Sequence, residues 1–213
     1  MLIGLTGGIG SGKSTIAQQL RAMGYPVYDT DSQAKRLIQS DPHVREQITA
    51  LFGTEVYQDG VYQTALVAQR VFADPVLLSR LNAIVHPAVR ADILRWSSSL
   101  TSLPNNLIAS SPHRLSGELE GEPIAFIECA ILYSSHIHTL CDAVVQVTAP
   151  EDVRIQRTIQ RDHTTIDKVR ARMRAQDKEF LGHHPDLVVN NDGKTEIHDI
   201  CLEIQDFFCN FAG

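Results

Sequence analysis

A glycine-rich stretch near the start of the chain constrains the fold more than any other feature. The residues Gly7-Gly8-Ile9-Gly10-Ser11-Gly12-Lys13-Ser14 satisfy the pattern GxxxxGK[ST]. They follow an apolar run over residues 2–6 that is typical of a buried strand, and they precede a helical repeat over residues 13–23. Glycines let a backbone curl so that its N–H groups point at phosphate oxygens, and the following helix adds the positive end of its dipole. The stretch therefore predicts a nucleotide-phosphate site at a strand-to-helix turn.

The side chains of this loop predict binding of ATP and Mg²⁺. Lys13 has the charge and reach to neutralise the β- and γ-phosphates, and the Ser14 hydroxyl is the expected Mg²⁺ ligand. A GTPase is disfavoured, because the chain has no NKxD pattern and no convincing DxxG switch. The residues of the loop that we expect to contact ATP are Gly8, Gly10, Ser11, Gly12, Lys13, Ser14 and Thr15.

The rest of the chain alternates apolar runs with helical repeats, which predicts an α/β fold of the P-loop kinase type. Further strands are expected at residues 25–29, 124–129, 143–148 and 187–190, and an amphipathic helix is expected at 195–211. Continuously apolar strands are typical of a parallel sheet covered by helices on both faces. Ligands of such sheets lie beyond the carboxyl ends of the strands. We therefore expect the loop, Asp29, Asp31 and Glu128 near one edge.

Helical repeats and turn residues divide the chain into regions of one domain. Residues 41–100 are mainly helical, with a helix boundary expected near Pro87, since the residue before a proline is pushed out of the helical conformation. Clusters of Ser, Pro, Asn and Gly in 97–123 predict a long surface loop. The expected regions are a core of 1–31, 124–149 and 185–213, a helical region of 32–96, the variable loop 97–123 and a helical lid of 150–182.

Composition excludes several classes of protein. The chain of 213 residues has a formal charge of −6 and a pI of about 5.8, which disfavours a nucleic-acid partner. It has no apolar run of membrane-spanning length and no secretory signal, so we expect a cytoplasmic protein. None of its 4 cysteines forms a CxxC pair, and its 9 histidines include no HExxH motif, so the sequence gives little support for a zinc-binding site. The oligomeric state stays open.

Five stretches make the sequence similar to the dephospho-CoA kinase family. They are Leu5 to Thr15, Asp29-Thr30-Asp31, Leu81 to Val89 with its Ile-Val-His-Pro segment, Pro150 through Arg157, Arg161-Asp162 and Gln176, and Asp186 to Gly193. Together they span nearly the whole chain in the family's order. The resemblance implies ATP-dependent phosphorylation of the ribose 3′-hydroxyl of dephospho-coenzyme A. It also implies that the helical region binds this acceptor and that the lid closes over ATP.

The sequence departs from the family pattern in three places. The family usually has Pro-Leu-Leu-Phe-Glu after the third core strand, whereas this chain has Ala130-Ile131-Leu132-Tyr133-Ser134. Arg154 stands where the family often has glutamine, and the 97–123 loop is longer than expected. The first departure puts the acceptor side of the site in question more than the ATP side.

The resemblance assigns candidate roles, each with a simpler alternative. Asp31 is the expected general base and acceptor-binding residue, or otherwise only a helix cap. Glu128 is expected to hold a water of the Mg²⁺ shell, or otherwise to be structural. Arg157 is the first candidate to stabilise the transferring phosphoryl group, and Arg161 is the second candidate, expected to bind the nucleotide. The simpler alternative is that both arginines belong to a charged helix face that only contacts solvent.

Two further positions complete the predicted site. Asn191 is expected near the adenine, or otherwise in a turn. His86 is expected near the acceptor, or otherwise at a structural boundary. Two functions remain as alternatives: another small-molecule P-loop kinase that acts on a nucleoside or nucleotide, and a regulatory protein that binds ATP without turnover.

Overall fold

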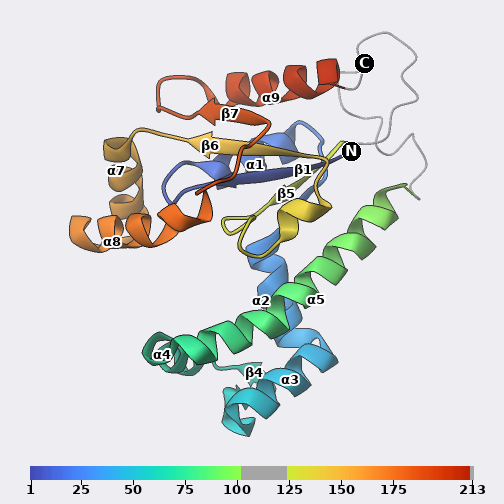
Figure 1. Ribbon diagram of the computed structural model, residues 1–213, viewed down its shortest axis with the longest axis vertical. Helices are drawn as coiled ribbons and strands as arrows, with labels where there is room; N and C mark the ends of the chain where they lie inside the picture. The colour runs from blue at the N-terminus through green and yellow to red at the C-terminus, as the bar shows by residue number, and fades with distance from the viewer. Residues whose placement is uncertain (102–123, 212–213) are drawn as a thin grey trace. The chain divides into compact units, whose positions relative to one another are not determined.

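The computed structural model describes residues 1–101 and 124–211 of the chain. It divides into two compact units, one made of Met1–Tyr28 with Ser99–Gly213 and the other of Asp29–Ser98 (Figure 1). The first corresponds to the predicted core and lid, and the second to the predicted helical region.

A five-stranded sheet forms the centre of the first unit (Figure 1). Its strands lie in the order β2-β5-β1-β6-β7, and the pairs β1–β5, β1–β6 and β6–β7 are parallel. The predicted parallel sheet is thus confirmed. The strands are β1 (Leu2–Gly7), β2 (Val27–Asp29), β5 (Ala125–Glu128), β6 (Ala143–Thr148) and β7 (Leu187–Asn190).

Two helices, α1 (Lys13–Ala22) and α9 (Ile197–Phe211), pack together on one face of this sheet. Apolar residues at helical spacing, such as Ile16 and Leu20, meet alternate strand residues there, and each is fully buried. Gly4 points to the opposite face, where an added Cβ would touch the Leu132 side chain. That face is covered by the segment after β5, which includes the short helix η2 (Ile137–Leu140). The sheet is therefore buried on both sides.

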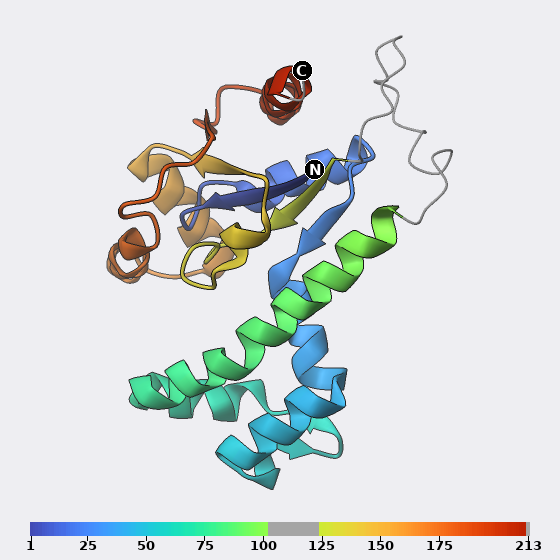
Figure 2. The same cartoon turned by 45° about the vertical axis from the view of Figure 1, so that its right-hand side comes forward.

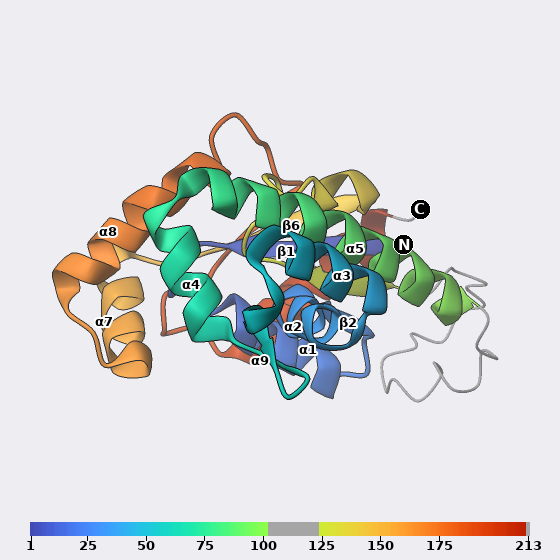
Figure 3. The ribbon, with the colours of Figure 1, turned by 90° about the horizontal axis from the view of Figure 1, so that it is seen from below.

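The predicted lid forms a pair of helices, α7 (Glu151–Asp162) and α8 (Ile166–Gln176), followed by the short helix η3 (Asp177–Glu179). The two helices lie side by side (Figure 3) around a small apolar core of their own. Ile155, Val169 and Met173 are its buried members, and Ile9 from the glycine-rich loop packs against them. The loop is thus joined to the lid by apolar packing.

The second unit is helical around its own apolar core of Val44, Ile48, Phe52, Val56 and Val67. Its elements are α2 (Thr30–Ser40), α3 (Pro42–Phe52), η1 (Thr54–Val56), β3 (Tyr57–Gln58), β4 (Val61–Tyr62), α4 (Thr64–Ala73) and α5 (Pro75–Thr101). The hairpin β3–β4 was not predicted, although its Asp59-Gly60 turn is a strong hairpin signal. Both turn residues have positive φ, 50° and 79°.

The boundary predicted near Pro87 is wrong, because α5 runs from Pro75 through Thr101 as one helix (Figure 2). Ile84 before the proline and Ala88 after it pack against the same apolar cluster. This packing outweighs the lost hydrogen bond and the steric preference at the proline. Residues 97–101 are consequently helical rather than part of the predicted loop, and 102–123 lie outside the described residues. No helix among the described residues is long and apolar enough to cross a membrane.

Candidate functional site

The glycine-rich loop folds as a tight cradle between β1 and α1. Gly10 and Gly12 have φ of 78° and 86°, in the left-handed region that favours glycine. A Cβ on Gly10 would collide with the Arg154 carbonyl oxygen, and one on Gly12 would collide with the Asn191 amide. The loop therefore needs glycine both for its curl and for close approach of its neighbours. The loop leads directly into α1, whose first N–H groups have no side-chain cap and are donors of the kind that bind phosphate at helix N-termini.

Lys13, Ser14 and Glu128 form a polar centre where the loop meets the end of β5. The Glu128 Oε1 accepts hydrogen bonds from Lys13 Nζ at 2.7 Å and from Ser14 Oγ at 2.6 Å. The side chains of Lys13 and Glu128 are only 11% and 7% exposed, so the ion pair is well shielded from water. Arg21 Nη2 lies 4.0 Å from the other Glu128 oxygen. The adjacent strands β1 and β5 bring these residues together from positions far apart in sequence.

The lid contacts the tip of the loop through two side chains whose role sequence reasoning missed. Arg154 Nε donates to the Ile9 carbonyl at 2.9 Å, and the Ile9 N–H donates to Gln176 Oε1 at 2.7 Å. Burial lowers the pKa of the Arg154 guanidinium, and the nearby carboxylates of Asp177 and Glu151 oppose that shift. Arg154 was noted as a departure from the family pattern and Gln176 as part of the resemblance, but neither was predicted to bind the backbone of Ile9. Backbone contacts such as these leave no signal in residue spacing.

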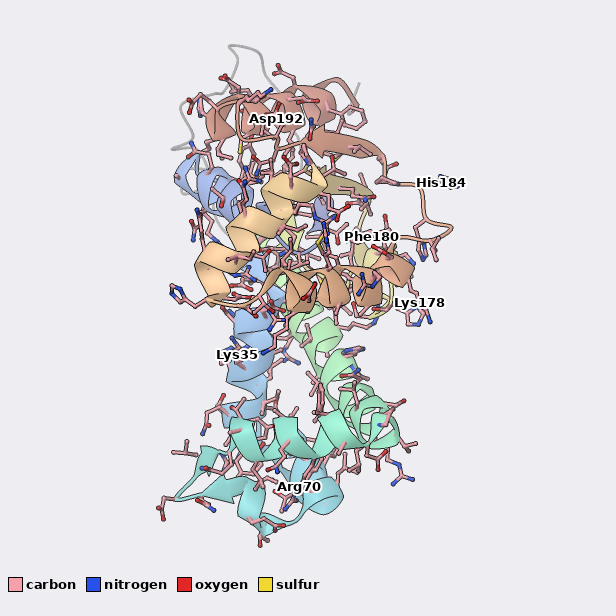
Figure 4. All side chains as sticks on the ribbon, turned by 90° about the vertical axis from the view of Figure 1, so that its left-hand side faces the viewer. Lys35, Arg70, Lys178, Phe180, His184 and Asp192 are labelled. Carbon is pink, nitrogen blue, oxygen red and sulfur yellow. The ribbon has the colours of Figure 1, made fainter. Side chains whose placement is uncertain are left out.

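Asn191 and Arg157 hold the other side of the loop. The Asn191 amide donates to the Ser11 carbonyl at 2.9 Å, and Arg157 donates to the Asn191 backbone and side-chain oxygens at 3.0 and 3.1 Å. Asn191 is 1% exposed, so these bonds are shielded from solvent. Asp192, the next residue, is labelled in Figure 4. Asn191 thus does more than form the turn considered as its simpler alternative, because it braces the phosphate loop directly.

Arg161 does not join this arrangement. Its side chain is 63% exposed and donates to Asp162 at 2.7 Å, and Arg172 donates to the same carboxylate at 2.6 Å. The hydrogen bond from Arg161 holds the pKa of Asp162 below its usual value, and the same bond raises the pKa of Arg161. Arg154 and Arg157 thus contact the loop, whereas Arg161 pairs within the lid.

Asp31 and His86 belong to the Asp29–Ser98 unit. Strand β2 ends at Asp29, so Asp31 lies in the first turn of α2 and not on the strand. The helix cap is Asp29, whose carboxylate accepts from the N–H groups of Asp31 and Ser32 at 3.0 and 3.2 Å. Because Asp29 is the cap of α2, the alternative that Asp31 is only a helix cap is wrong, and the Asp31 side chain is exposed. His86 is partly buried inside α5 and marks no helix boundary.

The segment that departs from the family pattern is held by the end of the lid. The buried carboxylate of Glu179 accepts from Tyr133 N at 2.7 Å and from Ser134 N at 3.3 Å. Phe180 and Lys178, beside it in the chain, are labelled in Figure 4. The His183 ring stacks on Tyr133 with 4.0 Å between centroids. Backbone and aromatic contacts therefore fix this segment without the proline and glutamate that the family usually has.

The donor set of the centre suits a nucleotide with a hard cation. A serine hydroxyl beside a carboxylate offers the oxygen ligands that Mg²⁺ prefers. Among residues 1–101 and 124–211, no group of three His, Cys, Asp or Glu residues could hold a metal by itself. Mg²⁺ sites of this kind commonly complete their coordination with phosphate oxygens and water. The loop, the Lys13 ammonium, the Ser14 hydroxyl and the Glu128 carboxylate together offer the charges and ligand atoms that suit a polyphosphate bound with such a cation.

Comparisons with known proteins agree with this geometry. A family model described as dephospho-CoA kinase matches residues 1–112 and 99–196. A dephospho-CoA kinase from Porphyromonas gingivalis is 38% identical over 177 residues, which cover 83% of this chain and 78% of that protein. A solved Thermus thermophilus structure is 30% identical with a TM-score of 0.74, covering 100% of this chain and 98% of that one. The dephospho-CoA kinase structure from Campylobacter jejuni has a TM-score of 0.66 at 18% identity and covers 100% of this chain and 98% of that one. At this identity the match shows that the two chains have the same fold.

Proposed function

This chain belongs to the dephospho-CoA kinase family, and we propose that it transfers the γ-phosphoryl group of ATP to the ribose 3′-hydroxyl of dephospho-CoA, giving CoA and ADP. The main observation behind this proposal is the polar centre that Lys13, Ser14 and Glu128 form beside the glycine-rich loop. Phosphoryl transfer depends mainly on positioning and on stabilising charge, which such a centre supplies. The reaction breaks the bond between the γ-phosphorus and its bridging oxygen and forms one to the acceptor oxygen.

The residues of the loop act on the nucleotide. The Lys13 ammonium exchanges its carboxylate partner for the β- and γ-phosphates, and the N–H groups at the start of α1 hold the phosphate oxygens. Mg²⁺ would be held by the Ser14 hydroxyl and, through water, by Glu128; when bound, it would neutralise charge on the phosphates. Asn191, proposed near the adenine, supports the loop through its hydrogen bond to the Ser11 carbonyl.

The remaining roles are assigned by the resemblance. Asp31 accepts the proton of the acceptor hydroxyl, and its exposure in the first turn of α2 leaves it accessible to a ligand. His86 lies in the helical unit that we propose binds dephospho-CoA. Arg157 stabilises charge on the transferring group, and Arg161 would join it only after leaving Asp162.

A coupled ADP-release assay with Mg-ATP tests the function. We expect turnover with dephospho-CoA and none with adenosine or a nucleoside monophosphate. Turnover of the nucleosides alone would instead make the chain another small-molecule kinase, and ATP binding without any turnover would make it a regulatory protein. Asp31→Asn should lose far more in kcat than in ATP affinity, whereas equal losses would argue against the base role.

A further inference from the structure

The side chain of Gln176, the last residue of α8, bridges two separate segments of the nucleotide core. Its Oε1 accepts from the Ile9 N–H at 2.7 Å, and its Nε2 donates to the Ala130 carbonyl at 3.1 Å. The residues that follow it, including Lys178 and Phe180, are labelled in Figure 4. Gln176 is partly buried, and both bonds are shielded in part from water. The bridge therefore links the lid, the phosphate loop and the segment after β5.

These two segments carry the two ends of the polar centre. Ile9 precedes Lys13 in the glycine-rich loop, and Ala130 closely follows Glu128. Lys13 and Glu128 themselves meet at 2.7 Å. A side chain that ties Ile9 to Ala130 thus restrains the separation of the backbone stretches from which both charged groups project. We propose that Gln176 is a positioning residue that aligns Lys13 with Glu128 for phosphoryl transfer.

The chemistry of the bridge explains why a glutamine is needed. A carboxamide offers an acceptor and a donor at the end of one side chain. Glutamate would keep the acceptor for Ile9 but would set a carboxylate oxygen against the Ala130 carbonyl. Methionine, of similar length, would keep neither bond. The two substitutions therefore separate the Ala130 bond from the Ile9 bond.

Other contacts keep both segments folded when the bridge is lost. Arg154 still holds the Ile9 carbonyl, and the Ile9 side chain still packs into the lid core. Glu179 still binds the N–H groups of Tyr133 and Ser134. Loss of Gln176 consequently affects the alignment of the centre rather than the presence of its parts, and small misplacements of reacting groups are costly in rate.

The test compares Gln176→Glu and Gln176→Met with the wild type and with Gln160→Glu, which makes the same chemical change at an exposed position of α7. For each protein, kcat and both KM values are measured with dephospho-CoA and Mg-ATP. ATP affinity by calorimetry and the melting temperature are measured on the same samples. The inference rests on the proposed function for its kinetic readout, whereas ATP affinity reports on the loop without any acceptor.

For Gln176→Glu we expect kcat to fall about tenfold with ATP affinity within about twofold of wild type, because one bond is lost and the loop bond is kept. Gln176→Met should lose at least as much in kcat and bind ATP about fivefold more weakly. Gln160→Glu should match the wild type.

Three results would overturn the inference. They are wild-type kcat in both Gln176 variants, a lower melting temperature with unchanged activity per folded molecule, and an equal loss of ATP affinity in both variants. If wild type turns over no acceptor, the proposed function fails, and the order of ATP affinities still decides whether the bridge supports the loop.

Discussion

Replacing Glu128 by glutamine removes the negative charge at the polar centre while preserving its size. Glu128 accepts from Lys13 at 2.7 Å and from Ser14 at 2.6 Å, and its side chain is 7% exposed. Glutamine keeps an oxygen that can accept a hydrogen bond, but the Lys13 ammonium loses its carboxylate partner. The variant therefore tests whether Glu128 is the counter-ion of Lys13 until a nucleotide arrives.

The magnitude follows from the burial of the pair. Removing one partner of a buried ion pair costs about 3–5 kcal/mol, and the retained acceptor places Glu128→Gln near the lower end, at about 3 kcal/mol. For a chain of this size the melting temperature should fall by about 6–12 °C. The phosphates of ATP offer Lys13 a new partner, so ATP should stabilise the variant by about 1–2 kcal/mol more than it stabilises the wild type.

The assay is thermal and urea unfolding with and without ATP, in EDTA so that no divalent cation contributes. Glu55→Gln is the matched control, because Glu55 pairs with Arg70 at 2.9 Å with the two side chains 49% and 34% exposed. We expect that exposed pair to contribute less than about 1 kcal/mol and to be indifferent to ATP. An unchanged stability in Glu128→Gln would refute the reasoning. So would an equal loss with and without ATP, since a purely structural carboxylate gives that result.

Two further predictions concern the loop and its support, and a third concerns the buried thiol of Cys201 in α9. Asn191→Ala should lower the free energy of unfolding by about 1–3 kcal/mol and raise the KM for ATP, because the Ser11 carbonyl loses its 2.9 Å donor and keeps only the 3.5 Å bond from Arg157; an unchanged KM in steady-state kinetics would show that the brace does not matter to ATP. Gly12→Ala should fold poorly or fail to bind ATP in calorimetry, because φ is 86° and its Cβ would collide with Asn191; wild-type affinity would contradict this. Burial raises the pKa of the Cys201 thiol from 9.0 to about 11, so the unfolded chain ionises first and the associated stability, present below pH 9, is lost as pH rises toward 11. Urea unfolding should therefore show the advantage of wild type over Cys201→Ala shrinking by about 2 kcal/mol between pH 8 and about pH 10.5, and a constant difference would refute the shift.

The sequence by itself determined the phosphate loop and the core sheet. The glycine pattern needs specific backbone angles, and Gly10 and Gly12 adopt them. Strands 143–148 and 187–190 were predicted with the bounds that β6 and β7 have, because continuously apolar runs between turns have few other folds available. These features depend on local rules of conformation and burial, which can be read along the chain.

Only the tertiary structure decided how distant side chains meet. Residue spacing could not show that Glu128 pairs with Lys13, that Asn191 braces Ser11, or that Gln176 binds Ile9 and Ala130. Nor could it show that α5 continues through Pro87, where packing on both sides outweighs a local preference. Such contacts join residues that are far apart in sequence, and many end on backbone atoms, which every residue carries. The sequence predicts which chemical groups the site contains, and the packing of strands, loop and lid determines how these groups are arranged.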